Sequence, residues 1–266
     1  MSTDSPAPSD QVHERALRDS GADAGTRRWL LERAAVGAAG LAAGAALVPT
    51  GEALARPASG RDNAGAASIH SFGTVAVTTE ALTVTLLTEL LRRVNLSTSV
   101  PAAVKAVFEG AYAAELDHFR FTRAHWRPTT TKFWIPDGFF GGSGDTVDLT
   151  AVGHALVAGE TLFVNLYLIG VTTFAATGHQ KFARYSAELA GCEAEHRVLA
   201  ETLLNANPPN NVGFEVYSIK QPAGIERALK GAGIGFGKQG SSAGAFYQLP
   251  RPPMKPPLRI GGNKPT

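Results

Sequence analysis

Residues 104–125 read VKAVFEGAYAAELDHFRFTRAH, and this stretch decides the fold. Apolar residues recur in it at steps of three and four, which is the spacing of one face of an α-helix. Glu115 and His118 fall on that same face, three residues apart, so both side chains are expected to point into the protein. The stretch therefore predicts a helix, beginning after Ser99 and ending near Trp126, that buries a carboxylate and an imidazole.

Three further stretches have the same spacing and also place a glutamate among apolar residues. They predict helices over about 74–95, about 148–178 and about 179–205. Asp148 is a suitable N-cap for the third helix, and Gly178 is a suitable left-handed residue to end it. The buried glutamates of these helices are Glu80, Glu160 and Glu193, and the last helix repeats the Glu-x-x-His spacing with His196.

The lengths of the connections predict how the helices are arranged. The first two helices are joined by about five residues and the last two by one or two, so each pair is expected to form an antiparallel hairpin. Residues 127–147 are long enough to run the full length of a helix pair at about 3.3 Å per residue. The predicted fold is therefore all-α, a four-helix bundle of two antiparallel hairpins joined by one long crossover, over residues 72–207.

The functional prediction rests on the polar residues that lie on the apolar faces of the predicted helices. Burying a carboxylate costs several kcal/mol unless it is paired or binds a metal, so one glutamate on the inner face of every helix needs a reason. Both Glu-x-x-His pairs and both lone glutamates lie about 17 or 18 residues from their hairpin turns, so they are expected to meet at one height. The candidate metal ligands are Glu80, Glu115, His118, Glu160, Glu193 and His196.

Composition excludes several other classes of protein. With 266 residues, of which 44% are hydrophobic, the chain can bury a sizeable core. A net charge of +2 without a long run of like charges gives no support to nucleic-acid binding. One cysteine excludes an internal disulfide framework, cysteine-rich zinc sites and iron–sulfur clusters held by several thiolates.

The first 55 residues are similar to a twin-arginine export signal. Paired arginines stand in the segment 26–31, a short Ala- and Gly-rich run follows over 34–48, and 53–55 reads Ala-Leu-Ala, a small-x-small cleavage site. The uncharged run of about 15 residues is shorter than the roughly 20 that span a bilayer. We therefore expect an exported protein, placed in the periplasm, on the cell wall or outside the cell, with residues 56–71 as a linker.

The C-terminal segment differs in composition from the rest of the chain. Gly and Pro make up 19 of the 59 residues in 208–266, which is too many for regular helices. We expect an irregular Gly/Pro-rich arm whose one ordered piece is a helical turn near 224–230. Its 8 basic and 2 acidic residues are suited to weak contact with an anionic surface of the cell envelope.

The order Glu, Glu-x-x-His, Glu, Glu-x-x-His resembles the di-metal ligand set of the ferritin-like superfamily. With its export signal and basic tail, the chain is most similar to the secreted branch that includes desiccation-related proteins. The resemblance implies that Glu115 and Glu193 bridge or chelate the metals, that Glu80 and Glu160 are terminal ligands, and that each histidine binds one metal. Dimers formed through helix faces are common in this superfamily.

Three functions are consistent with this resemblance. Carboxylates with two imidazoles suit two iron ions, or alternatively two manganese ions. The first function is oxidation of Fe(II), or another redox reaction with dioxygen or peroxide, and the second is a di-manganese catalase. The third is a non-catalytic envelope, desiccation or stress protein built on the same scaffold.

Two further residues lie close to the predicted ligands in sequence. Tyr167 is two helical turns from Glu160, where core packing is the favoured role over a role beside the metal. Cys192 adjoins Glu193 but points about 100° away around the helix, which favours a small buried apolar residue over a ligand.

Overall fold

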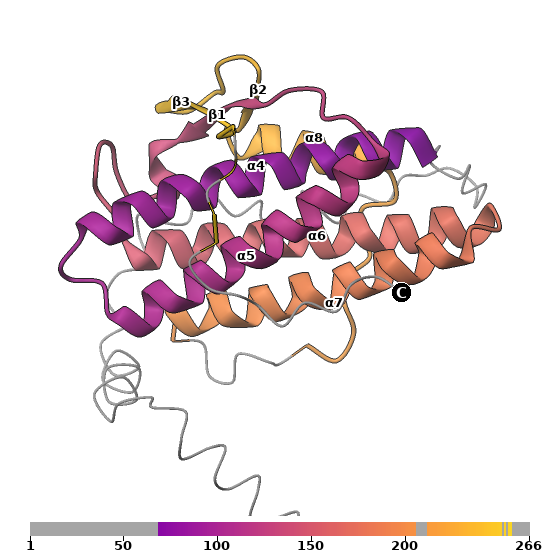
Figure 1. The fold of residues 1–266 in the computed structure, drawn as a ribbon, viewed down its shortest axis with the longest axis horizontal. Coiled ribbons are helices and arrows are strands. Elements are labelled where there is room, and N and C mark those ends of the chain that lie inside the picture. The colour runs from indigo at the N-terminus through magenta and orange to yellow at the C-terminus, as the bar shows by residue number, and fades with distance from the viewer. Residues whose placement is uncertain (1–68, 206–211, 252, 254, 257–266) are drawn as a thin grey trace, which may run out of the picture.

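The computed structural model describes residues 69–205, 212–251, 253 and 255–256. The predicted export signal and all but the end of the linker lie outside the described residues. The described chain is mostly helical, with a small three-stranded sheet on one side (Figure 1). The helices are α4 (Ile69–Leu96), α5 (Ala102–His125), α6 (Leu149–Ala176), α7 (Gln180–Leu203) and α8 (Pro222–Gly231), with a short 3₁₀ turn η1 (Asp137–Phe139).

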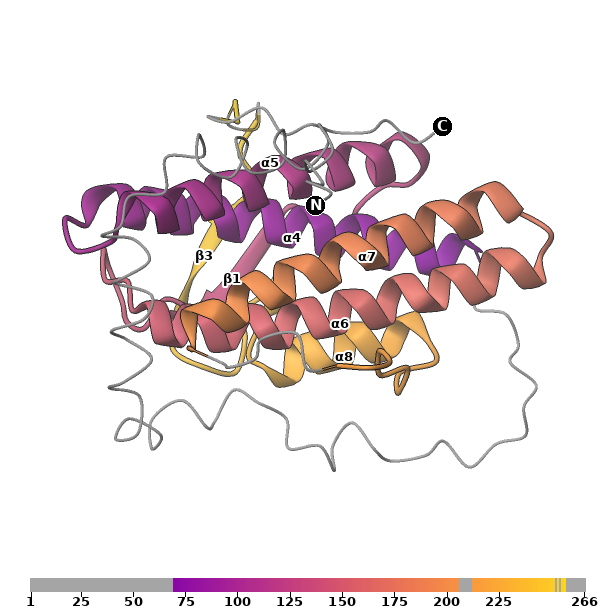
Figure 2. The same cartoon turned by 90° about the horizontal axis from the view of Figure 1, so that it is seen from below.

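The four long helices confirm the four predicted ones, with bounds that shift by a few residues. Helix α4 begins at Ile69, before the predicted domain start at 72. Helices α4 and α5 pack side by side, as do α6 and α7, and the two pairs face each other (Figure 2). The Asp148 side chain accepts a hydrogen bond from the Thr150 backbone N–H at 2.8 Å, so the predicted N-cap is confirmed. Gly178 ends the first helix of the second hairpin with a φ of 78°, as predicted.

The segment between the two hairpins contains a strand that the sequence analysis did not predict. Strand β1 (Lys132–Pro136) lies between β2 (Gly235–Phe236) and β3 (Gly244–Gln248), and both pairings are antiparallel. Phe133 and Ile135 of β1 are fully buried, while Lys132 is exposed and Trp134 half-buried, because successive side chains of a strand point to opposite faces. The fold is mostly helical, which is compatible with the predicted all-α class, and this small sheet is an addition that was not predicted.

The C-terminal segment is also more ordered than predicted. Helix α8 covers the predicted turn, and β2 and β3 add two strands where an irregular arm was expected. Glycine makes the close strand pairing sterically acceptable: a Cβ at Gly244 would lie 2.3 Å from the Ile135 carbonyl oxygen. The abundant glycines therefore permit a sheet here, although they exclude long helices.

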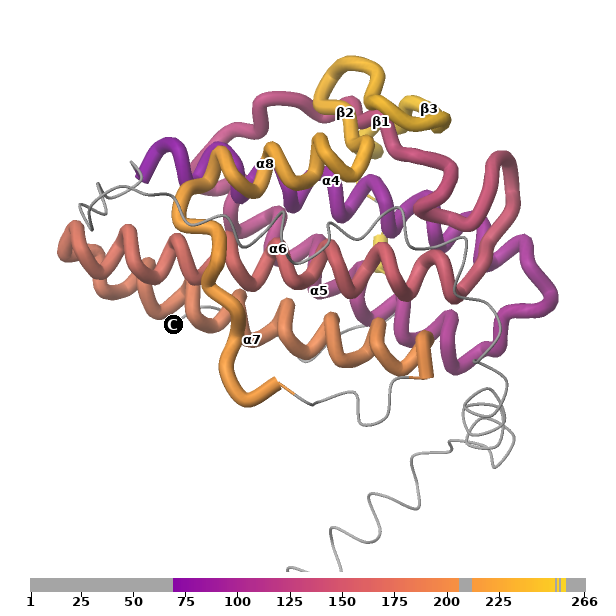
Figure 3. The backbone as a smooth tube through the Cα atoms, turned by 180° about the vertical axis from the view of Figure 1, so that it is seen from behind, coloured from indigo at the N-terminus to yellow at the C-terminus, as the bar shows by residue number. Residues whose placement is uncertain are grey.

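The C-terminal segment covers the side of the long helices that α4 and α6 form together. Helix α8 packs against both α4 and α6, and β1 and β3 also contact α4 (Figure 3). Helices α4 and α6 are long and apolar enough to cross a membrane, but 78% and 56% of their most apolar windows lie buried inside the protein. This burial is typical of core helices.

A buried arginine joins the sheet to the helices. Arg93 is 1% exposed, and its guanidinium donates hydrogen bonds to the Gly142 and Thr146 carbonyl oxygens, each at 2.9 Å. It also donates to the Tyr247 hydroxyl on β3 at 2.9 Å and to Glu89 at 2.8 Å. Arg93 therefore fixes the long crossover and the C-terminal strand to α4.

Candidate metal centre

The structure brings all six predicted ligand residues together between the four long helices. Helix α4 supplies one glutamate, α6 supplies another, and α5 and α7 each supply a glutamate and a histidine one turn later. Five of the residues are buried, and the His196 side chain is 9% exposed. We call this set, which consists of Glu80, Glu115, His118, Glu160, Glu193 and His196, the six-residue cluster.

The cluster divides into two overlapping groups of four residues. The ligand atoms of each group lie within 4.8 Å of one another, so each group could hold a metal ion. One group contains Glu80 and His118, and the other contains Glu160 and His196. Glu115 and Glu193 belong to both groups, and we call them the shared carboxylates. Either group could therefore hold a metal ion, and the two groups have two carboxylates in common.

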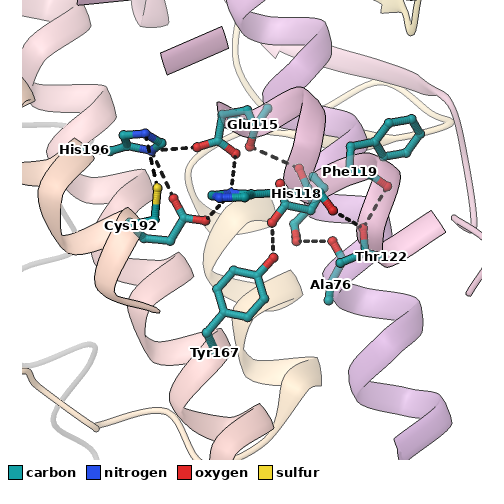
Figure 4. Close-up of polar contacts among 12 residues, drawn as sticks. Ala76, Glu115, His118, Phe119, Thr122, Tyr167, Cys192 and His196 are labelled. Atoms are coloured by element: carbon teal, nitrogen blue, oxygen red, sulfur yellow. Dashed lines mark hydrogen bonds and ion pairs between the residues drawn. The ribbon is translucent and has the colours of Figure 1, made fainter. Parts of the chain in front are cut away.

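Both histidines direct the Nδ1 atom toward the shared carboxylates (Figure 4). His118 Nδ1 lies 3.1 Å from a Glu193 oxygen and 3.6 Å from a Glu115 oxygen. His196 Nδ1 lies 2.8 Å from Glu115 and 3.2 Å from Glu193. The Glu-x-x-His spacing produces this geometry, because residues three apart share one face of a helix.

Several buried polar atoms of the cluster have no hydrogen-bond partner. An unpartnered polar atom in a protein interior costs about 1–3 kcal/mol, and more if it is charged. A cation placed among these atoms would remove that cost, so the donor set fits a metal ion. The atoms are Glu80 Oε2, both Glu115 oxygens, His118 Nδ1, Glu160 Oε2 and Glu193 Oε1.

The environment moves the pKa values of the cluster carboxyls in opposite directions. Burial raises the pKa of Glu80 and of Glu160 well above the usual range, and neighbouring carboxylates raise both further. Burial also opposes ionisation of Glu115, but the close contacts and positive charges of the two histidines outweigh it and hold its pKa well below the usual range. Without a cation, the cluster therefore favours charge on Glu115 and protons on the two terminal glutamates.

The histidines bind protons tightly in the same environment. Burial lowers the pKa of His118, but the charge of Glu193 and the nearby Cys192 and Glu115 side chains raise it well above the usual range. Burial likewise lowers the pKa of His196, while the adjacent Cys192 thiol and the shared carboxylates raise it. Protons on the two imidazoles thus neutralise part of the carboxylate charge that a metal ion would otherwise neutralise.

Two residues next to the cluster have roles that differ from the favoured predictions. The Tyr167 hydroxyl donates a hydrogen bond to Glu80, so this tyrosine does more than pack in the core. Cys192 is only partly buried, and its Sγ lies 3.8 Å from His196 Nε2. Sequence spacing placed both residues near the predicted ligands but did not predict these contacts, because each depends on the rotamer and on the packing of neighbouring helices.

Arg197 is a residue beside the cluster that the sequence analysis missed. It follows Glu193 by one turn of α7, is 7% exposed and forms two hydrogen bonds with Glu215, at 2.6 and 2.7 Å. The segment that contains Glu215 is also held to α6, where Asn165 Oδ1 accepts hydrogen bonds from the Ser218 and Ile219 backbone N–H groups. The one sequence feature that pointed to Arg197 was its position four residues after Glu193. Solvent-exposed arginines occur at the same spacing, so this feature did not identify it.

Comparison with known proteins yields no relative: no family model, curated protein or solved structure matches this chain. Function therefore has to be inferred from the residues of the cluster and their geometry. The two overlapping ligand groups are the most informative feature, because their buried carboxylates and imidazoles could hold a metal ion.

Proposed function

We propose that the chain is an exported ferritin-like four-helix bundle protein that binds two metal ions, iron in preference to manganese, and supports redox chemistry in stress protection. The observation that carries the proposal is the pair of ligand groups that share Glu115 and Glu193. The Glu, Glu-x-x-His repeat supports assignment to the ferritin-like superfamily. The sequence of residues 1–55 supports export.

The charge and chemistry of the donors favour two divalent ions. Four ionised carboxylates bring a charge that two divalent cations cancel, and the two neutral imidazoles add none. Carboxylate oxygens with imidazole nitrogens suit iron and manganese, whereas copper or a thiophilic ion would favour a different set. Glu115 and Glu193 are the residues that would bridge the two ions, with Glu80 and His118 on one ion and Glu160 and His196 on the other.

Iron at this position would supply one-electron redox steps. Two Fe(II) ions held by the cluster would supply the two electrons that, with two protons, reduce dioxygen to hydrogen peroxide. The protein would hold the ions in a site that is nearly closed to water, since five cluster residues are buried. The Tyr167 hydroxyl would orient Glu80, the terminal ligand to which it donates.

Anaerobic loading with Fe(II), followed by exposure to dioxygen or peroxide, tests this function. We expect the mature protein to form Fe(III) at least about 10-fold faster than Fe(II) in buffer, and the double variant Glu115→Gln with Glu193→Gln to match buffer. The matched control is Asp117→Asn with Glu195→Gln, which removes two exposed carboxylates from the same helices and is expected to behave like the parent.

The outcome also separates the alternative functions. A site that selects manganese and releases dioxygen from peroxide would show a di-manganese catalase instead. A mature protein that binds neither metal and turns over neither oxidant would contradict the redox proposal. It would leave the non-catalytic stress or envelope function, in which the cluster variants behave like the parent.

A further inference from the structure

The two ring nitrogens of His196 face different surroundings. Its Nδ1 lies 2.8 Å from Glu115 and 3.2 Å from Glu193, whereas its Nε2 lies 3.8 Å from the Sγ atom of Cys192 (Figure 4). Cys192 belongs to the same helix as His196 and precedes it by four residues, so the thiol and the ring lie on adjacent turns. The thiol thus contacts the nitrogen that points away from the shared carboxylates.

A histidine that binds a metal through one nitrogen needs a partner for the other. The metal-binding nitrogen must present a lone pair, so the proton of the neutral ring must sit on the opposite nitrogen. An acceptor at that nitrogen fixes both the tautomer and the ring orientation. Within the described residues, the hydrogen bonds of His196 give Nε2 one partner, which is Cys192.

A second observation shows what the Nδ1 side of the ring faces. Both oxygens of Glu115 and Oε1 of Glu193 are buried and have no hydrogen-bond partner, and both residues are nearly or fully inaccessible to solvent. These atoms converge with His196 in the group that also contains Glu160. When the ring proton is held on Nε2, the lone pair lies on Nδ1. This lone pair would therefore point at the place where a cation fits.

We propose that Cys192 is a positioning residue whose sulfur accepts the Nε2–H of His196 and so holds Nδ1 ready to bind a metal ion. The inference rests on the proposed function, because it assigns Cys192 a role at the same metal site. This role differs from the two that the sequence suggests for Cys192, a metal ligand and a small buried apolar residue. Here the thiol neither binds the metal itself nor serves as apolar packing. A sulfur atom is an adequate but weak acceptor, which suits a ring that needs orienting.

Two substitutions of Cys192, one that keeps a hydrogen-bond acceptor and one that removes it, distinguish the positioning role from a packing role. Cys192→Ser keeps a hydrogen-bond acceptor in a smaller, polar side chain, whereas Cys192→Val keeps an apolar side chain of similar size without an acceptor. We expect Cys192→Ser to bind two Fe(II) ions within about 3-fold of the parent affinity. We expect Cys192→Val to bind at least one of the two ions about 10–100-fold more weakly, because His196 loses its orienting partner.

Anaerobic Fe(II) titration against a competing chelator measures both affinities, and the melting temperature without metal reports on folding. Should Cys192→Val fold poorly, Cys192→Ala carries the same expected loss. Normal binding of both ions by the folded Val or Ala variant would overturn the proposal, as would equal weakening in the Ser and Val variants. A parent protein that binds no Fe(II) would instead show that the proposed function fails, so the two failures are distinguishable.

Discussion

The affinity of the cluster for divalent metal is expected to rise steeply with pH, by at least about 10-fold per pH unit for each ion. A metal can bind His118 or His196 only after the imidazole proton leaves, and the carboxylates around these rings hold their pKa well above the usual value of about 6.5. One proton per ion gives a 10-fold change per pH unit. Protons that leave Glu80 and Glu160, whose pKa values burial raises, would steepen the dependence further.

The stability of the metal-free protein is expected to change with pH in the opposite direction. Groups whose pKa is higher in the folded state stabilise it most when protonated, so this contribution is lost as pH rises through the folded pKa. The loss begins above about pH 4.3 for Glu80 and Glu160, and above about pH 6.5 for the two histidines. Glu115 acts in the opposite sense, since its lowered pKa gives stability that is lost only as pH falls below about 4.3.

Titrations with Fe(II) under anaerobic conditions at pH 5.5, 6.5 and 7.5 measure the affinity, and melting temperatures with and without metal measure the stability. The difference between the two melting temperatures should widen as pH rises. An affinity that stays constant over this range would show that the ions bind elsewhere, away from the protonated imidazoles.

Replacing Arg93 by methionine is expected to lower the free energy of unfolding by about 3–5 kcal/mol. The variant would leave the Gly142 and Thr146 carbonyl oxygens without their donor and would remove the charge that pairs with Glu89. Arg93 is 1% exposed, so water cannot replace the lost bonds without opening the packing around them.

Arg92→Met is the matched control for this substitution. Arg92 is the adjacent residue and also pairs with Glu89, but its side chain is 46% exposed, and we expect a loss below about 1 kcal/mol. Urea unfolding of the metal-free variants gives both values. Equal losses in the two variants would contradict the role assigned to the buried guanidinium.

The long helices and the convergence of the six-residue cluster could be predicted because one periodicity determines both. A spacing of three and four residues that persists over 24 to 28 residues identifies each helix, and it places the acidic and imidazole side chains on the same face as the apolar ones. Short turns at residues 97–101 and 177–179 then bring the two halves of each hairpin to the same height.

The sheet could not be predicted because its determinants are neither long nor local. Strand β1 has only five residues, and β2 has two. Phe133 pairs with Phe236 and Tyr247, more than 100 residues away, and no local pattern encodes that pairing. Similarly, the pattern of its own helix predicts only a core residue at Tyr167. The glutamate that accepts its hydroxyl hydrogen bond, Glu80, is 87 residues away in the sequence.

Elemental analysis of the mature protein, purified from its native export route without added metal, tests most directly whether the cluster holds two ions. The parallel sample is the variant with Glu115→Gln and Glu193→Gln. We predict about two iron ions per chain in the parent and almost none in the variant, since both ligand groups lose their shared carboxylates. A parent that contains no iron or manganese, and takes up no Fe(II) under anaerobic conditions, would contradict the central claim.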